Sequence, residues 1–586
     1  MSQEYRSPTG PARQPRSRYW LAVIPFAWMI GIFALMRPDA IVAKTSVPYQ
    51  VKWLIYDESD LTALSLRGAN IWMGRLPGRL DEPVQPDWDL PSTVLPQQLD
   101  APQPEYAERF YLEYPTPTLV LFWLGHALQA GNTVEIPPIV ADGQQFSIGF
   151  FTPRNDSERA IWTRLGNAVR FYVAMMTFGL VAMIVILIRG YGPELCEPGP
   201  VWLAVLPGAV FFSLNRFDVL PALATACCFA CLGRGWRTGA GAWLAMGVML
   251  KVYPVLFVPV LLRYLGPRNA IPFLLGFVGL GALGGGLSLL ATDWQGTVGP
   301  VQVQLSRPLE ETSWTLYGRV LPMSLGKSST GRLAILAAFV LGVAITRPTN
   351  LASVLRRCGV ILVVFVNLAV FWSPQWIVWF LPIVIPLARN RRRFIVAMLA
   401  LDALNYFCFP ILFWILWGQL VQDIGYEAAM HVIDAIVYVR VVAWAGLAGL
   451  FLWDELVAPR TVSPIAAKEP FHANLVGWTA TFWKAGAASG TPRGLTWVSA
   501  TPTGDPLFAW DSTDARLIAL LPVQVQFAPI PGSDLEDVPQ AHEPRTVTAM
   551  FVFDGATWQT DGRAVFNLTP QQVIERSAGR FQLQNS

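Results

Sequence analysis

Long apolar runs alternate with short polar segments from residue 19 to residue 453. A helix needs about 20 apolar residues to cross the hydrocarbon core, and several of these runs are somewhat shorter. The pattern predicts an all-α polytopic membrane protein with about twelve transmembrane helices. The predicted spans are 19–37, 166–188, 200–214, 217–232, 237–250, 252–265, 270–291, 333–346, 358–372, 375–388, 394–417 and 433–453.

Arginines mark one set of span ends. Four precede the first run, and others follow the second, fourth, sixth, eighth and tenth runs, for example Arg189, Arg234 and Arg263. Cytoplasmic loops carry an excess of Lys and Arg, so residues 1–18 are expected to be cytoplasmic. Residues 19–457 are then the transmembrane domain, and residues 38–165 form one large external loop. The short run Pro117–Ala130 is interpreted as an interfacial or re-entrant helix. If it were a full span, the arginine-rich ends of all later spans would lie on the external side of the membrane.

The composition changes after Leu456. Alternating apolar and polar residues predict strands at Leu520–Phe527 and Thr546–Phe553, and Pro570 opens a predicted helix over Thr569–Arg580. We expect residues 458–586 to form a small α+β domain on the cytoplasmic side.

Composition excludes several classes of protein. Only 14% of the residues are charged and the net charge is +3, with no basic domain that would bind nucleic acid. Six Cys and four His are too few for a disulfide framework or a His-rich metal site. No cofactor and no metal are expected, because the sequence contains no compact carboxylate cage. The first loop is acidic, with twelve acids and six bases over residues 38–115, so binding of a divalent cation there stays an alternative.

Polar residues interrupt the apolar runs at their outward ends. Ionisable residues in or beside a membrane are costly, so they are functional candidates. Their convergence on one face predicts an external site with carboxylates and at least three cations. The candidates are Asp57, Asp60, Glu113, Arg216, Asp218, Lys251, Tyr253, Arg307, Glu311 and Gln375.

This combination suits transfer from a lipid-linked phosphate. A carboxylate can act as general base on an acceptor hydroxyl, and Lys or Arg can hold a phosphate. No Gly-rich nucleotide loop accompanies a cytoplasmic domain, which disfavours a nucleotide-sugar donor.

Structural interpretations of the same residues stay open. Glu113 could cap the helix after Pro117, and Arg216 and Asp218 could pair at a tight hairpin. Lys251 could extend to the membrane interface, and Tyr253 could anchor there. Ser373-Pro374-Gln375 could be a simple turn.

Five segments in order resemble those of the GT-C membrane glycosyltransferases, and most closely the glycosyltransferase 87 family, which is similar to polyprenyl-phosphate-mannose-dependent mannosyltransferases. In the first loop Asp60, Gly74 and Pro77 match the family, and Leu64 stands where it has Tyr. The other segments are LEYPTPTLVLF from Leu112, the Asn215–Leu262 block with NRFDVLP and KVYP, RPLEETSW from Arg307, and FWSPQWIVWFLP from Phe371.

The resemblance implies a hexosyltransferase in which Asp60 is the general base, with Asp57 near enough to compete for that role and Glu113 also at the catalytic centre. The hydroxyl it activates displaces polyprenyl phosphate with inversion. The implied substrates are a polyprenyl-phosphate hexose, expected to be mannose, and a glycan, glycolipid or protein acceptor. The implied location is a bacterial plasma membrane, in contact with membrane lipid.

Two alternatives remain. A transporter or flippase of lipid-linked or small solutes would also carry polar breaks in its helices, although its polar residues would gather near the midplane. A catalytically inactive GT-C relative could act as a scaffold for the C-terminal domain.

Overall fold

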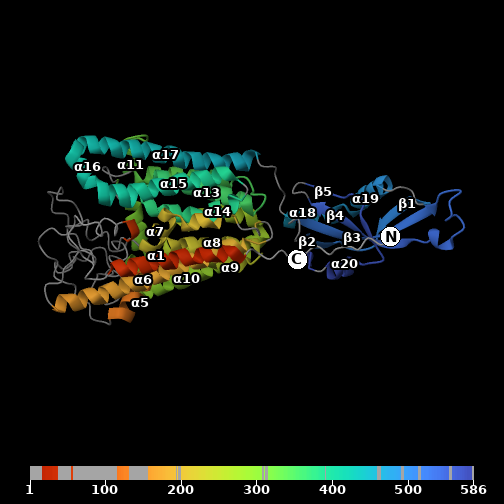
Figure 1. Ribbon diagram of the computed structural model, residues 1–586, viewed down its shortest axis with the longest axis horizontal. Coiled ribbons are helices and arrows are strands. Elements are labelled where there is room, and N and C mark those ends of the chain that lie inside the picture. The colour runs from red at the N-terminus through yellow and green to blue at the C-terminus, as the bar shows by residue number, and fades with distance from the viewer. Residues whose placement is uncertain are drawn as a thin grey trace. The chain divides into compact units, whose positions relative to one another are not determined.

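The computed structural model describes residues 16–36, 54–56, 115–130, 156–192, 195, 199–306, 309, 315–389, 391–457, 464–489, 494–511, 516–553, 557–577 and 579–583. The chain divides into two units, one of which is Arg18–Leu456 and the other of which contains Val457–Ser586. The first unit is helical and the second combines helices with one sheet (Figure 1).

The helical unit is built from elements of very different length. Its helices, with short 3-10 or π segments marked η, are η1 (Arg16–Ala22), α1 (Val23–Leu35), α5 (Thr116–Ala130), α6 (Asp156–Arg189), η6 (Val201–Val205), α7 (Pro207–Asn215), α8 (Val219–Gly233), α9 (Arg237–Leu250), η7 (Tyr253–Phe257), α10 (Val258–Ser306), α11 (Met323–Lys327), α12 (Ser329–Ala344), α13 (Leu351–Leu368), η8 (Pro374–Phe380), α14 (Leu381–Leu387), α15 (Arg392–Tyr406), η9 (Phe407–Leu416), α16 (Trp417–Ile424) and α17 (Tyr426–Val457).

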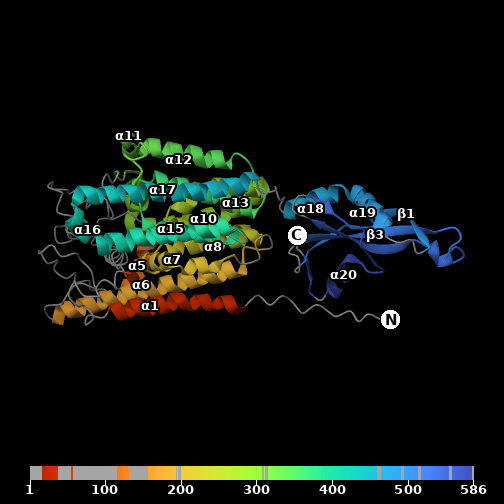
Figure 2. The ribbon, with the colours of Figure 1, turned by 45° about the horizontal axis from the view of Figure 1, so that its top comes forward.

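Six of the described helices are long and apolar enough to cross a membrane. A seventh candidate is the pair α7 and α8, which is bent by 107° at its break. The long helices run side by side in both views of the bundle (Figures 1 and 2). Length and apolarity therefore indicate a multi-pass membrane protein.

The helix α10 contains a reversal of direction. Gly266 has φ +71°, which is incompatible with a continuing α-helix. Before it, Arg263 donates to the carbonyl of Ile345, and beyond it Gly276 packs on Thr238 and Gly284 on Met249. The later part of α10 thus runs parallel to α9, whereas the earlier part leads away from the C-terminal end of α9. The predicted runs 252–265 and 270–291 correspond to these two parts.

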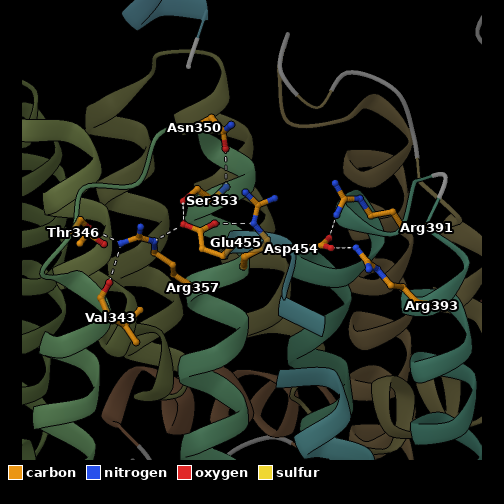
Figure 3. A network of polar contacts seen from close by, with 10 residues as sticks. Val343, Thr346, Asn350, Ser353, Arg357, Arg391, Arg393, Asp454 and Glu455 are labelled. Atoms are coloured by element: carbon orange, nitrogen blue, oxygen red, sulfur yellow. Dashed lines mark hydrogen bonds and ion pairs between the residues drawn. The ribbon is translucent and has the colours of Figure 1, made fainter. Parts of the chain in front are cut away.

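Arginines gather at one end of the bundle, which we call the cationic end (Arg234, Arg347, Arg356, Arg357, Arg391 and Arg393). There Arg356 and Arg357 both pair with Glu455 of α17, with Nε to carboxylate oxygen distances of 2.8 and 2.9 Å. Arg391 and Arg393 pair with the buried Asp454, which precedes Glu455 in α17 (Figure 3). These pairs attach the end of α17 to α13 and to the start of α15.

The second unit is a seven-stranded antiparallel sheet with helices on both faces. The strand order is β5-β4-β3-β2-β7, with β1 also paired to β3 and β6 to β4. Its elements are α18 (Pro464–Ala473), α19 (Leu475–Ser489), β1 (Leu495–Pro502), β2 (Leu507–Asp511), β3 (Arg516–Pro529), η10 (Pro539–Ala541), β4 (Arg545–Phe553), β5 (Trp558–Gln559), β6 (Ala564–Phe566), α20 (Pro570–Arg576) and β7 (Phe581–Leu583).

Strand β3 shows why this sheet has two covered faces. Successive side chains of a strand point to opposite faces. Leu517, Ala519 and Leu521 pack with Phe471 and Phe482 of α18 and α19, whereas the residues between them pack with α20. The two strands and the C-terminal helix predicted from the sequence are confirmed, and Thr569 caps that helix with its side chain.

Glycines in α10 allow a test of the packing of α9 on α10. A Cβ at Gly276 would collide with the backbone of Thr238, whereas a Cβ at Gly279 would have nothing within 4 Å. We expect Gly276→Ala to destabilise the protein by about 1–3 kcal/mol because overpacking forces the helices apart. Gly279→Ala is the matched control and should leave stability equal or slightly higher. Thermal unfolding of the full chain in detergent measures the stability of both variants. Equal melting temperatures would contradict the close packing of α10 on α9 at Gly276.

Candidate functional site

Three helix breaks meet at the end of the bundle opposite the cationic end. We call this meeting point the break junction (residues 216–218, 251–252 and 369–373). Its first break bends α7 against α8, its second separates α9 from η7, and its third separates α13 from η8. Arg216, Lys251 and Ser373 each have extended backbone at these points. An extended residue after each helix ends the i to i−4 ladder, so polar side chains and backbone become available there.

A buried ion pair joins the three breaks. Lys251 Nζ lies 2.8 Å from Asp218 Oδ1, and Trp379 Nε1 donates to the same oxygen at 2.6 Å. Asp218 is completely buried, and the Lys251 side chain is 16% exposed. Within the described part of the chain, the second oxygen, Asp218 Oδ2, has no hydrogen-bond partner.

Aromatic rings enclose the ammonium group of Lys251. Its Nζ lies 4.9 Å from the centre of the Phe217 ring and 5.2 Å from that of Trp379. Such contacts stabilise a cation where water is excluded. The carboxylate and the rings together hold Lys251 in one place, so the residue does not extend freely to the membrane interface.

Tyr253 belongs to a row of stacked rings. Its ring lies 4.0 Å from the Trp379 ring at an interplanar angle of 10°, and Trp379 in turn stacks on Trp376 at 5.3 Å. The Tyr253 hydroxyl lies 3.4 Å from Thr225 Oγ1. Tyr253 is 3% exposed, so it is a packed member of the junction and the interpretation as an interfacial anchor is wrong.

Arg216 does not pair with Asp218, which corrects the hairpin-pair interpretation. Its Nη1 donates to the carbonyl of Asn215 at 3.0 Å, and its guanidinium lies 5.5 Å from the centre of the Phe409 ring. Asp218 is instead paired across the bundle with Lys251. The pairing follows from the 107° bend, which directs the first turn of α8 toward α9.

Gln375 lies in the same short helix as the two tryptophans. It is 8% exposed and directly precedes Trp376 in η8. The structure assigns Pro374 and Gln375 to the first turn of η8 with Ser373 as its N-cap, so the interpretation of these three residues as a simple turn is wrong.

A short segment before the first-loop acids is anchored at the junction. The carbonyl of Ile55 accepts from Asn215 Nδ2 at 3.1 Å and from Trp28 Nε1 at 2.9 Å. The carbonyl of Leu54 accepts from the Tyr406 hydroxyl at 2.6 Å. Residues 54–56 are thus held by α1, α7 and α15, immediately before Asp57 in the sequence.

The helix α5 begins at the junction. Thr118 Oγ1 lies 2.8 Å from the carbonyl of Leu250 and 3.1 Å from that of Met249, in the last turn before Lys251. Phe122 packs edge-on against Phe217 at 5.8 Å. The first turn of α5, which follows the predicted Glu113 segment, is therefore fixed beside Lys251.

The structure brings Arg216, Asp218, Lys251, Tyr253 and Gln375 to one junction. The predictions on Asp57, Asp60, Glu113, Arg307 and Glu311 fall outside the described residues. Sequence reasoning did not single out Trp379, although FWSPQWIVWFLP contains it. The segment carries two tryptophans three residues apart among apolar residues. Because a buried indole N–H needs an acceptor, this pair indicated that a polar group lies against the segment.

The described side chains offer ligands for an anion more than for a metal. No three His, Cys, Asp or Glu side chains within the described ranges lie close enough together to hold a metal ion. Ammonium and guanidinium groups are phosphate ligands, and the junction holds one of each in Lys251 and Arg216. Comparison of the chain with protein-family models, curated proteins and solved structures finds no match.

The ion pair at the junction predicts strong coupling between Asp218 and Lys251. Asp218→Asn or Lys251→Met alone leaves one buried charge without its partner, which typically costs about 3–5 kcal/mol. The double variant removes both charges, so its loss of stability should be clearly smaller than the sum of the single losses. Melting temperatures of the four proteins in detergent measure the coupling. Additive losses would show that the two charges do not stabilise each other.

Proposed function

We propose that the chain is an integral-membrane glycosyltransferase of the GT-C type. It would transfer a hexose, expected to be mannose, from a polyprenyl-phosphate donor to an acceptor on the external face of a bacterial plasma membrane. One observation carries this proposal. The break junction gathers Arg216, Asp218 and Lys251 directly beside residues 54–56, from which the chain continues to Asp57 and Asp60.

The proposed reaction is a single displacement. The carboxylate of Asp60 removes the proton of an acceptor hydroxyl, and the acceptor oxygen forms a bond to the anomeric carbon. The bond from that carbon to the phosphate oxygen breaks, so polyprenyl phosphate leaves with the electron pair. Inversion follows because attack and departure occur on opposite sides.

The cations of the junction have a role in this scheme. Negative charge grows on the leaving phosphate, and fixed positive groups stabilise such charge best where water is excluded. Asp218, Trp379 and the rings around Lys251 hold the ammonium in place before substrate binds. Pre-organisation of this kind reduces the cost of reorganisation during the reaction.

The proposed topology has about twelve spans, with both termini and residues 458–586 in the cytoplasm. In this topology the crossings beyond the six long helices would be α7, α8, α9, the part of α10 after Gly266, and the short helices α12 and α14. The arginines support this orientation, because they gather at the cationic end and the break junction lies at the other end of the bundle.

A transporter is the second candidate, and the bent α7–α8 pair favours it. Discontinuous helices with polar breaks often form substrate sites in transporters. A transporter would move substrate across the vesicle membrane without changing it chemically. The two candidates therefore differ in whether the product contains a new glycosidic bond.

The base assignment predicts the effect of one substitution. Asp60→Asn should reduce glycosyl transfer from polyprenyl-phosphate mannose in reconstituted vesicles by about 100-fold or more, because proton transfer by a positioned base contributes roughly that much. Asp57→Asn is the matched control, three residues earlier, and should retain most activity. Full activity in Asp60→Asn with loss in Asp57→Asn would assign the base to Asp57 instead.

The orientation predicts which side of the membrane two residues face. A cysteine in Asp60→Cys should react with a membrane-impermeant maleimide applied from outside, in a background without the six native cysteines. A cysteine in Gln540→Cys, an exposed position of the sheet unit, should react only after the membrane is permeabilised. Labelling of both positions from the same side would contradict the proposed topology.

A further inference from the structure

Three exposed arginines lie at or near the reversal of direction at Gly266, and we call them the reversal arginines. Arg263 precedes Gly266 by three residues, Arg268 follows it by two, and Arg347 comes from the segment after α12. A Cβ built at Gly266 would lie 3.6 Å from Arg347 Nη2. An arginine from a distant part of the chain is therefore packed against the turn.

Backbone carbonyls hold two of the reversal arginines in place. Arg263 Nε donates to the carbonyl of Ile345 at 3.2 Å, and Arg347 Nη2 donates to the carbonyl of Tyr264 at 3.3 Å. The last carbonyls of a helix have no N–H partner in the helix itself, and the negative end of its dipole favours a cation. Each arginine thus binds the end of the other's helix, and both guanidiniums are held between the same two helix ends.

No carboxylate compensates the reversal arginines within the described part of the chain. Four other arginines of the cationic end pair with Glu455 or Asp454. Arg263, Arg268 and Arg347 form no ion pair with any Asp or Glu that the structure describes. The positive charge at the reversal is therefore available to an anion from outside the chain.

The donors at the reversal suit a phosphate group. A guanidinium has five N–H donors, and Arg263 and Arg347 each make one hydrogen bond to the described residues. Arginine binds phosphate oxygens through pairs of parallel N–H groups. All three reversal arginines are exposed, so their side chains are accessible from the surface of the bundle.

Exposed apolar side chains continue from the arginines along the same two helices. In α12, Ile345 is 71% exposed and Leu341, one turn before it, is 60% exposed. In α10, Ile271 is 60% exposed and follows Arg268 by three residues. Exposed apolar surface of this kind marks contact with membrane. A free anion would use only the arginines, whereas a lipid anion would use the arginines and the apolar side chains.

We propose that the reversal arginines bind the headgroup phosphate of an anionic phospholipid in the leaflet at the cationic end of the bundle. Basic sites between transmembrane helices on the cytoplasmic side recognise such headgroups, and this leaflet is the cytoplasmic one in the proposed topology. Arginines without carboxylates repel the ammonium group of phosphatidylethanolamine, so the site selects a lipid with net negative charge. The inference goes beyond the proposed function, because the site lies at the end of the bundle opposite the break junction.

The test measures lipid binding directly. Native mass spectrometry of the purified full-length chain in detergent gives the dissociation constant of phosphatidylglycerol. The double variant Arg263→Gln/Arg347→Gln should bind about tenfold more weakly than the wild type or worse, because each arginine adds to the attraction for an anionic headgroup. Phosphatidylethanolamine should bind the wild type more weakly than phosphatidylglycerol by a similar factor.

Two other exposed arginines supply the matched control. Arg189 ends α6 and Arg392 begins α15. Arg189 lies next to Gly190, whose carbonyl accepts from Arg234 of the cationic end, and Arg392 lies between Arg391 and Arg393. The double variant Arg189→Gln/Arg392→Gln removes the same number of charges from the same end of the bundle. It should bind phosphatidylglycerol as the wild type does.

Every outcome decides for or against the site. Unchanged affinity in Arg263→Gln/Arg347→Gln overturns the proposal, and so does equal binding of the two lipids by the wild type. An equal loss in the control variant would show a general attraction of this end for anionic lipid and overturn a specific site. Inorganic phosphate that competes at the same concentration as the lipid would show a free-anion site and overturn the lipid. If the double variant does not fold, the two single variants decide, and unchanged affinity in both overturns the proposal.

This inference and the proposed function fail separately. Sugar transfer by the wild type together with unchanged lipid binding in Arg263→Gln/Arg347→Gln would overturn only the lipid site. Loss of phosphatidylglycerol binding in that variant and not in the control would support the lipid site even in a protein that transfers no sugar.

Discussion

The pair of Asp218 and Lys251 is the constraint on which the half of the bundle around the break junction depends. Removing two charges from water costs several kcal/mol for each, and only close, well-aligned partners offset that cost. Here the partners come from three elements, with Asp218 at the start of α8, Lys251 directly after α9 and Trp379 in η8. The break before α8 and the break after α9 must therefore lie at the same level, because a shift of either along its helix would separate Asp218 from Lys251.

The two ends of the bundle handle charge in different ways. At the cationic end Glu455 accepts from Ser353, Arg356 and Arg357, and Arg357 also donates to the carbonyl of Val343 at 3.0 Å (Figure 3). Such a network leaves little freedom and closes the ends of α13 and α17 against each other. At the break junction one carboxylate oxygen accepts two donors and the other, Asp218 Oδ2, has no partner within the described residues.

Periodicity and charge placement predicted much of the fold. The runs 217–232 and 237–250 correspond closely to α8 and α9, because a helix surrounded by lipid or by other apolar helices must itself be apolar. The alternation in Leu520–Phe527 predicted β3, because Val523, Val525 and Phe527 are buried on one face while Gln524 and Gln526 are exposed on the other. Of the polar residues singled out from the sequence, Asp218 and Lys251 pair directly, and Tyr253 stacks on the Trp379 ring that contacts both.

Other features depend on side-chain directions that a linear pattern does not contain. The partner of Asp218 was open between Arg216 and other cations, and it was the bend of 107° that decided for Lys251. Trp379 reads as one more apolar residue of its segment, and its role depends on the direction of a single N–H.

The environment of Lys251 decides what its charge does in this bundle. A lysine locked between a carboxylate and two aromatic rings is a fixed positive point whose charge is largely compensated before any ligand arrives. Its first effect is therefore to hold the start of α8 and the end of α9 together. A site that is ordered in this way before a ligand arrives needs little reorganisation when one binds.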